Sequence, residues 1–192
     1  MSLTSGTTGQ RKMAVHCHES LVANVQAISH PRHIGLTDKD VLLCTAMLGH
    51  SYALFGCVCK AIVQGASCVF LETTDTAGLL EALEKHKVSM LSTVPYVARG
   101  LLDHPERMKH DLGCLKYFMT SGSCITEDIG RRLFQELKLS NFIQQYGQTE
   151  ALFVAAGLKD APPRYGSSGR LGTGVEAMVT SFRPSGKIRA TT

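Results

Sequence analysis

The sequence predicts an α/β fold in which a parallel sheet is flanked by helices. Apolar runs of strand length alternate along the chain with stretches whose apolar residues recur at helical spacing, and this alternation is typical of parallel-strand architectures. Hydrophobic residues make up 44% of the 192 positions and charged residues 19%, a balance that suits a globular chain long enough for one substantial domain.

The first half of the chain is expected to form three strands and two helices. Leu21, Val22, Val25 and Ile28 fall at helical spacing, and Gly65 is suited to end a second, more apolar helix. The expected strands span residues 13–17, 41–44 and 68–71, and the expected helices span residues 19–29 and 52–63.

The second half alternates in the same way. Three helices are expected here. The first would be capped by Asp75 or Thr76, the second would have Pro95 in its first turn, and the third would be capped by Thr126 and run to residue 137. The expected strands span residues 88–93, 115–120 and 141–145. Residues 160–169 are rich in Pro and Gly and are expected to form a surface loop, and the polar tail 182–192 is expected to be unanchored.

The most informative chemical pattern is Thr-Ser-Gly-Thr-Thr-Gly-Gln-Arg-Lys at residues 4–12. Hydroxyls, backbone N–H groups near glycines and a lysine ammonium can together surround the oxygens of a polyphosphate. The spacing excludes a Walker A loop, because only Thr7 and Thr8 separate the glycines and Met13 follows Lys12. A polar Gly-rich turn without a ligand is the alternative.

This loop resembles the signature of the adenylate-forming superfamily, which includes acyl-CoA synthetases, 4-coumarate–CoA ligases, luciferases and the adenylation domains of nonribosomal peptide synthetases. The usual loop reads Ser/Thr-Ser-Gly-Thr-Thr-Gly-x-Pro-Lys-Gly. The chain matches it through Gly9 and at Lys12, and it departs at Arg11 and Met13.

Four further segments resemble motifs of the same superfamily in their usual order. They are Met-Leu-Gly-His-Ser-Tyr-Ala-Leu at 47–54, Met-Thr-Ser-Gly-Ser-Cys at 119–124, Gln-Gln-Tyr-Gly-Gln-Thr-Glu at 144–150, and Gly-Ser-Ser-Gly-Arg-Leu at 166–171 followed by Gly-Val-Glu at 174–176. The resemblance therefore covers nearly the whole chain, and it implies part of the large N-terminal domain of an adenylate-forming enzyme.

The resemblance also implies roles for individual residues. Lys12, His50, Thr149 and Glu150 are the implied catalytic residues. His50 and Tyr52 would face the acyl substrate, and Glu150 would hold Mg²⁺ through water, because Mg²⁺ keeps several waters and uses few protein carboxylates. The residues implied to bind the nucleotide are Thr4, Ser5, Gly6, Thr7, Thr8, Gly9, Lys12, Gly122, Ser123, Cys124, Gln145, Tyr146, Gly147 and Thr149.

The implied reaction is the ATP-dependent activation of a small-molecule carboxylic acid to an acyl-adenylate, followed by thioester formation with coenzyme A. ATP, Mg²⁺ and coenzyme A are thus the expected cofactors. Residues 1–192 correspond to a partial AMP-binding domain, and the superfamily's N-terminal region, Thr-Gly-Asp motif and C-terminal lid domain have no counterpart in the printed sequence. We expect the printed chain alone not to complete acyl-CoA formation.

Three other functions stay open on the sequence. An amino-acid-activating adenylation domain and a luciferase-like oxygenase share the adenylation half of the reaction. A non-catalytic nucleotide-binding paralogue is favoured by the departures at Arg11 and Met13.

Composition bears on partners and compartment. The net charge is only +4 and the basic residues are scattered, so a nucleic acid partner is not expected. No apolar run reaches the roughly 18 residues of a membrane-spanning helix. The seven cysteines include no C-x-x-C pair, which favours buried free thiols in a reducing, intracellular compartment over structural zinc. Histidines other than His50 are expected on the surface or in packing roles.

Overall fold

The centre of the molecule is a seven-stranded sheet whose order is β4-β3-β5-β6-β7-β8-β9. The computed structural model describes residues 2–4, 12–71, 75–178, 180–182 and 188–190. The strands of the sheet are β3 (Val41–Cys44), β4 (Ser67–Phe70), β5 (Met90–Thr93), β6 (Tyr117–Thr120), β7 (Asn141–Gln148), β8 (Leu152–Ala156) and β9 (Arg170–Leu171). The pairs from β4 to β7 are parallel, which confirms the predicted α/β class, whereas β8 and β9 are antiparallel additions.

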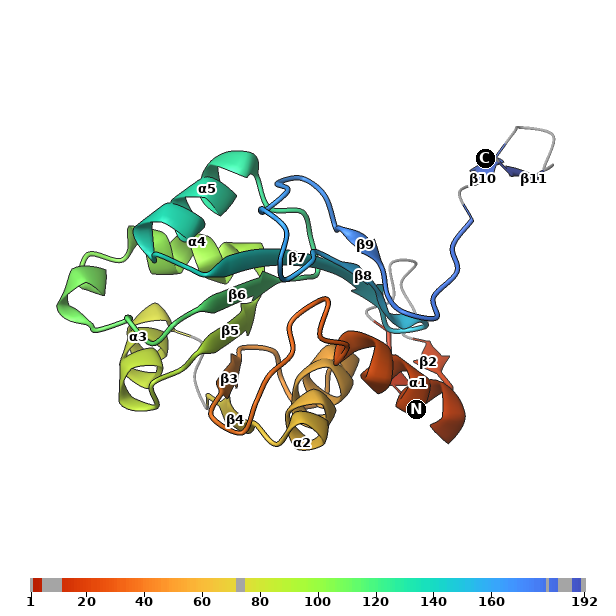
Figure 1. Ribbon diagram of the computed structural model, residues 1–192, viewed down its shortest axis with the longest axis horizontal. Coiled ribbons are helices and arrows are strands. Elements are labelled where there is room, and N and C mark those ends of the chain that lie inside the picture. Colours follow the sequence, from red (N-terminus) through yellow and green to blue (C-terminus); the bar gives the residue numbers. More distant parts are fainter. Residues whose placement is uncertain (1, 5–11, 72–74, 179, 183–187, 191–192) are drawn as a thin grey trace.

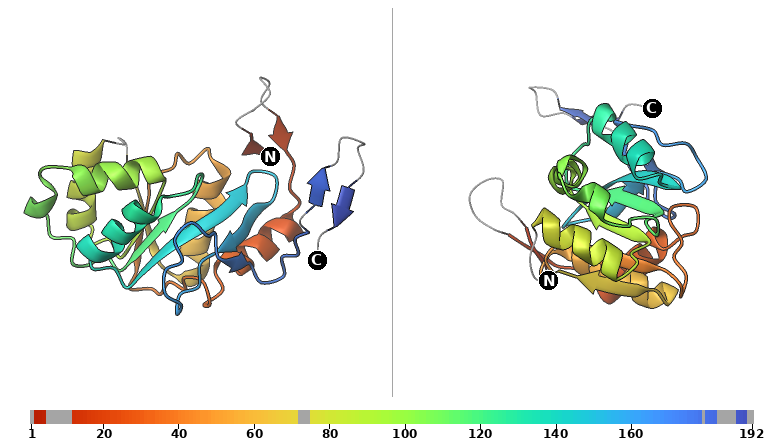
Figure 2. Two further views of the ribbon diagram at one scale, coloured as in Figure 1. Left: turned by 90° about the horizontal axis from the view of Figure 1, so that it is seen from above. Right: turned by 90° about the vertical axis from the view of Figure 1, so that its left-hand side faces the viewer.

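Helices cover both faces of this sheet (Figure 1), and the end-on view in Figure 2 shows the same layering. One face is covered by α3 (Thr76–Lys85), α4 (Pro95–Asp103) and α5 (Glu127–Glu136). The other face is covered by α1 (His18–Ile28), the π-helix η1 (Tyr52–Cys59) and α2 (Lys60–Gln64).

Side chains alternate between the two faces along each central strand. Leu43, Leu91, Phe118 and Phe142 are register partners from β3 to β7, and all four are buried in the core under α3, α4 and α5. The residues of these strands that face the opposite core include Leu42, Met90, Met119 and Ile143. Because both faces are buried, the strands have nearly continuous apolar sequences, as parallel strands usually do.

Most predicted elements are confirmed, and the strand at residues 41–44 matches to the residue. Asp75 caps α3, since its Oδ1 accepts a hydrogen bond of 2.8 Å from the Gly78 N–H, and Pro95 lies in the first turn of α4. Thr126 occupies the N-cap position of α5, although its side chain makes no capping bond to the helix. The expected loop at 160–169 contains no helix or strand.

Three predicted elements are wrong in extent or kind. The strand expected at 13–17 is only β2 (Met13–Ala14), which pairs with β1 (Ser2–Leu3) outside the main sheet. The helix expected at 52–63 is continuous and ends at Gly65 as expected, but its first part is the π-helix η1 and only its last part is the α-helix α2. The strand expected to end at residue 145 continues to Gln148 and turns back into β8, which was not predicted.

Several short elements were also missed, including β1 and β9. A 3₁₀ helix, η2 (Arg107–Lys109), follows α4. Within the tail expected to be unanchored, β10 (Thr180–Phe182) pairs with β11 (Ile188–Ala190) in a hairpin that lies away from the main sheet (Figure 1). Part of this tail is outside the described residues.

All seven cysteines lie in the described ranges and none forms a disulfide, but they are not all buried. Cys44 and Cys57 are buried, whereas Cys17, Cys114 and Cys124 are exposed. In the described part of the chain, no helix combines the length and the apolar character needed to cross a bilayer.

One lysine is buried completely at the junction between helices. Lys60 begins α2, and its Nζ donates a hydrogen bond of 3.2 Å to the carbonyl oxygen of Ile28 at the end of α1. No carboxylate forms a salt bridge with Lys60 among the residues that the structure describes. Burial therefore lowers the pKa of Lys60 to about 8.

We predict that Lys60 makes folding stability rise with pH. Between about pH 8 and the ordinary pKa of 10.5, the unfolded chain carries a proton on this amine that the folded chain lacks, so the free energy of unfolding increases with pH. From about pH 7 to about pH 9, the wild type should gain about 1 kcal/mol more than Lys60→Met. Denaturant titrations at the two pH values measure the difference.

The exposed Lys85 provides the matched control for this experiment, because Lys85→Met also removes one positive charge. Its pH dependence should equal that of the wild type. A Lys60→Met variant with the wild-type pH dependence would contradict the account of the buried amine.

Candidate functional site

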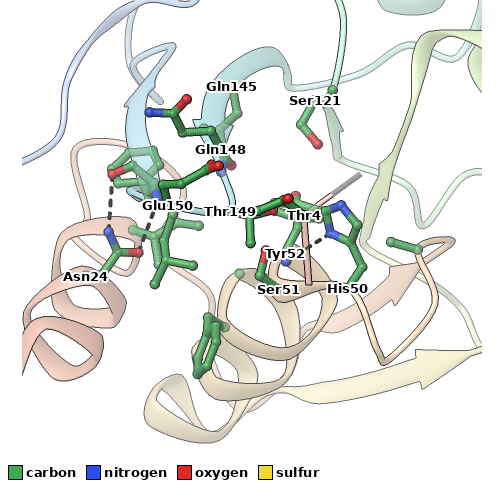
Figure 3. Close-up of a pocket in the computed structure, with 18 of the residues that line it drawn as sticks. Thr4, Asn24, His50, Ser51, Tyr52, Ser121, Gln145, Gln148, Thr149 and Glu150 are labelled. Carbon is green, nitrogen blue, oxygen red and sulfur yellow. Dashed lines mark hydrogen bonds between the residues drawn. The ribbon is translucent and has the colours of Figure 1, made fainter. Parts of the chain in front are cut away.

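A cavity of about 570 Å³ opens beyond the carboxyl ends of the parallel strands. Ala46, Val94 and Ser121 line it, and they follow β3, β5 and β6 respectively. Ligands of open α/β sheets bind at this edge. Figure 3 shows that side chains from well-separated segments, such as Thr4, His50 and Gln145, are arranged around the same hollow.

The Gly-rich stretch connects the two strands of a hairpin, β1 and β2. Thr4 and Lys12 close the base of this hairpin, because the Thr4 N–H donates to the Lys12 carbonyl at 2.8 Å and the Lys12 N–H donates to Thr4 Oγ1 at 3.2 Å. Both residues line the cavity. The predicted contacts of Ser5, Gly6, Thr7, Thr8 and Gly9 lie outside the described residues.

His50 and Tyr52 both line the cavity. The backbone N–H of Tyr52 donates to His50 Nδ1 at 3.1 Å. Nδ1 is therefore an acceptor, and a neutral His50 carries its proton on Nε2. That proton can be donated to a ligand in the cavity.

The Tyr52 ring forms part of the cavity wall, but its hydroxyl group points into the sheet. The Tyr52 hydroxyl is hydrogen-bonded to Ser92 Oγ and lies 3.1 Å from Met119 Sδ. Burial raises the pKa of Tyr52 well above its ordinary value, so the hydroxyl stays protonated. Tyr52 can thus contribute an apolar ring surface, and not a free hydroxyl, to the site.

The turn after β6 brings only one of its three predicted nucleotide residues to the cavity. Gly122 lines the cavity and has a φ of +86°, a conformation that favours glycine. Ser123 and Cys124 are exposed and are not among the lining residues. Their roles stay predictions.

The last predicted segment is the turn between β7 and β8, which we call the 148–152 turn after the residues that it joins. Gln148 pairs with Leu152 across it, and the side chains of Thr149 and Glu150 are carried in the loop between them. Gln145, Gly147, Thr149 and Glu150 line the cavity, whereas Tyr146 does not and is 50% exposed.

Gln145 carries the buried polar atom that best fits a bound ligand. Its side chain is buried at the cavity wall, and its Oε1 has no hydrogen-bond partner among the described residues. A buried acceptor without a partner is costly, and a donor group on a ligand would satisfy it.

Gly147 allows the chain to fold back at this point. The register of the β7–β8 pair shifts between Tyr146 and Gly147, and a Cβ atom at Gly147 would lie 2.2 Å from the carbonyl oxygen of Leu152. Leu152 itself has a φ of +57°, which is typical of the last position of a tight hairpin loop. Glycine at position 147 is therefore required by the close approach of the two strands.

A metal ion at this site would depend on few protein ligands. No group of three or more His, Cys, Asp or Glu side chains suited to a metal occurs within the described ranges. Glu150 is exposed at the cavity. A single carboxylate beside phosphate groups fits Mg²⁺, which binds through one or two carboxylates, substrate phosphates and water.

Several lining residues were given no role in the sequence analysis, although Ser51, Ser121 and Gln148 lie within the quoted motifs. Most of the others gave no chemical signal. Asn24 was the exception, because it falls at helical spacing with Leu21 and Ile28, on the apolar face of α1. A polar residue on such a face generally has a specific partner. The other missed residues are Ile28, Ala46, Ser51, Phe55, Gly56, Val94, Ser121, Gln148, Leu152 and Phe153.

Comparison with known proteins decides the family. A family model described as AMP-binding enzyme matches residues 1–184. The chain belongs to this AMP-binding enzyme family. It is similar to the 4-coumarate–CoA ligase-like 2 protein of Arabidopsis thaliana, with 31% identity over 180 residues that cover 92% of this chain and 31% of that protein.

Solved structures of the family share the fold. The anthranilate CoA ligase AuaEII in complex with anthranoyl-AMP superimposes with a TM-score of 0.86 at 21% identity, and the match covers 98% of this chain and 36% of that chain. The ATP-bound RpMatB-BxBclM chimera B1 superimposes with a TM-score of 0.84 at 26% identity and the same coverage.

These neighbours confirm the expected large-domain fold of adenylate-forming enzymes. This AMP-binding enzyme chain spans about a third of the length of the proteins that it matches.

We predict that Gly147→Ala disrupts the 148–152 turn. The added Cβ would collide with the Leu152 carbonyl, and a displaced backbone at such a site costs roughly 1–3 kcal/mol of stability. The matched control is Gly49→Ala, because a Cβ at Gly49 has no neighbour within 4 Å. Thermal unfolding should separate the two variants, and equal midpoints would show that the turn tolerates a side chain.

Proposed function

We propose that this chain supplies the ATP- and carboxylate-binding surface of an AMP-forming acid–thiol ligase. The observation that carries the proposal is that Thr4 and Lys12 at the base of the Gly-rich hairpin, His50 and residues of the 148–152 turn all line one cavity. The family match and the similarity to a CoA ligase support the same reaction class.

The polar part of the cavity is suited to ATP. Lys12 and the hydroxyls of Thr4 and Thr149 would contact the phosphates, and Gly122 and Gln145 would contact the adenosine. ATP binding to the chimeric structure at 26% identity supports this assignment. A Mg²⁺ ion held by Glu150 and the phosphates would supply charge neutralisation during displacement of pyrophosphate.

The apolar part of the cavity is suited to the acyl group. Tyr52, Phe55, Ile28 and Val94 contribute apolar surface, and Gly56 allows the Tyr52 ring to pack closely against the helix backbone, where a Cβ would lie 2.8 Å from the ring. His50 and Thr149 both line the cavity, and Figure 3 labels both among its lining side chains. The Nε2–H of His50 would orient the carboxylate of an acid with an apolar tail.

Within this proposal the carboxylate oxygen attacks the α-phosphorus of ATP, a P–O bond to pyrophosphate breaks, and an acyl-adenylate forms. The residues at the cavity act by positioning the two reactants and by stabilising the charge that develops on the phosphate oxygens. Coenzyme A is the proposed acceptor of the acyl group, because the Arabidopsis relative is named as a CoA ligase.

The direct test is isotope exchange between pyrophosphate and ATP in the protein at its natural length. A panel of aromatic, medium-chain and amino acids should give exchange with one class of carboxylic acid. Exchange only with amino acids would identify an amino-acid-activating enzyme, and light emission with a luciferin would identify an oxygenase. No exchange with any acid would reject adenylation.

We predict that Lys12→Ala slows the acid-dependent exchange of pyrophosphate with ATP. The loss should be about 2–4 kcal/mol in transition-state free energy, because an ammonium beside the phosphates stabilises developing charge. The control is Lys39→Ala, which removes an exposed lysine that does not line the cavity. Equal turnover in the two variants would refute a phosphate role for Lys12.

We predict that Glu150→Gln raises the Mg²⁺ concentration needed for half-maximal exchange. The substitution keeps the shape of the side chain and removes the charge that attracts the cation. The control Glu81→Gln changes an exposed carboxylate on α3 that does not line the cavity. An unaltered Mg²⁺ titration in Glu150→Gln would argue that the ion is held elsewhere.

A further inference from the structure

Asn24 connects helix α1 to the far strand of the candidate site. Its Nδ2 donates to the carbonyl oxygens of Ala151 at 3.3 Å and Phe153 at 3.2 Å, and its Oδ1 accepts from the Phe153 N–H at 3.2 Å. Figure 3 shows this side chain reaching from the helix to the hairpin. The amide thus pairs with the backbone of Phe153 as a neighbouring strand would.

His16 holds the other side of the same turn. Its Nε2 lies 2.9 Å from the carbonyl oxygen of Thr149, and because a carbonyl only accepts, this nitrogen carries the hydrogen. The His16 ring also packs edge-on against Phe55, with 6.5 Å between ring centroids. His16 follows β2 closely, so it links the Gly-rich hairpin to the 148–152 turn.

Besides these contacts, the described residues constrain the turn through the Gln148–Leu152 strand pair and a hydrogen bond of 3.2 Å from the Ala151 N–H to the Gln148 carbonyl oxygen. Gln148, Glu150 and Ala151 are exposed, so packing does not fix their backbone. Both Asn24 and His16 bind main-chain atoms on either side of Glu150, and neither binds the side chains that face the cavity. This arrangement leaves the Thr149 and Glu150 side chains free for a ligand and restricts the backbone that carries them.

We propose that Asn24 and His16 are positioning residues that hold the 148–152 turn so that Thr149 and Glu150 meet the Mg²⁺-bound phosphates of ATP. This inference rests on the proposed function. Asn24 and His16 lie outside the recognised motifs. Their role would be to hold a short exposed loop as precisely as contacts in a transition state require.

The test compares Asn24→Asp and Asn24→Ala with the wild type. Asn24→Asp keeps the shape of the side chain but places a carboxylate oxygen where the amide N–H donates to two carbonyl oxygens. Because those hydrogen bonds cannot form, this substitution should release the turn without leaving a cavity. Gln26→Ala is the matched control, since it removes an exposed amide from the same helix. Hydrogen exchange of the segment 147–153, the unfolding midpoint, and acid-dependent ATP–pyrophosphate exchange are measured for each protein.

Both Asn24 variants should exchange amide hydrogens faster in segment 147–153. They should also raise the half-saturating Mg²⁺ concentration several-fold and lower kcat on the order of tenfold to a hundredfold. The KM for the acid should stay close to that of the wild type, because the acyl side of the cavity is untouched. Faster hydrogen exchange with unchanged kcat and Mg²⁺ dependence would overturn the proposal.

The His16 variants provide a second test that does not depend on the stability of the Asn24 variants. Glutamine can place an N–H near the position of the histidine Nε2, so His16→Gln should keep most of the activity and His16→Ala should lose it in the same manner as Asn24→Asp. Equal activities of His16→Gln and His16→Ala would overturn the role of this hydrogen bond.

If the wild type shows no ATP–pyrophosphate exchange with any acid, the proposed ligase function is refuted. Calorimetry of Mg²⁺-dependent ATP binding then decides whether Asn24 and His16 position the turn. Weaker binding by Asn24→Asp than by Gln26→Ala supports the positioning role, and equal binding overturns it. A wild type that does not bind ATP would overturn both the function and the inference.

Discussion

Parallel pairing of β3, β5, β6 and β7 is the constraint on which the site depends. In a parallel sheet every carboxyl end lies at the same edge, so residues that follow different strands, such as Ala46, Val94 and Ser121, meet around one cavity. The two buried cores hold these strands in register through ladders such as Leu43–Leu91–Phe118–Phe142. Substitutions in these cores would therefore affect the site without touching it.

The antiparallel hairpin adds what the parallel strands do not supply. β7 extends past the carboxyl edge of its neighbours, and the turn to β8 carries Thr149 and Glu150 over the cavity. Gly147 permits the close approach of the strands, and Asn24 and His16 tie the turn to α1 and to the Gly-rich hairpin. Side-chain to main-chain hydrogen bonds thus couple the turn to two segments that lie more than a hundred positions earlier in the sequence.

The sequence predicted the parallel part of this structure better than the antiparallel part, for physical reasons. A strand buried on both faces is a short apolar run between turn residues, as at residues 41–44, and Asp75 is a recognisable cap. The β7–β8 turn has no Asn-Gly or Gly-rich loop signal, and Thr-Glu-Ala is compatible with a helix start. Among the described residues, nine of the predicted site residues line the cavity and Ser123, Cys124 and Tyr146 do not, because motif spacing does not fix which way each side chain points. Asn24 was missed because its partners are backbone atoms more than a hundred positions away.

The most direct measurement of the central claim is a crystal structure of the protein, at its natural length, with a non-hydrolysable acyl sulfamate analogue of an acyl-adenylate. The account predicts that the adenosine lies against Gly122 and Gln145 and that the acyl group extends toward Tyr52 and Gly56, with the sulfamate between His50 and Thr149. Binding of the analogue outside this cavity, or with the acyl group and the adenosine exchanged, would contradict it.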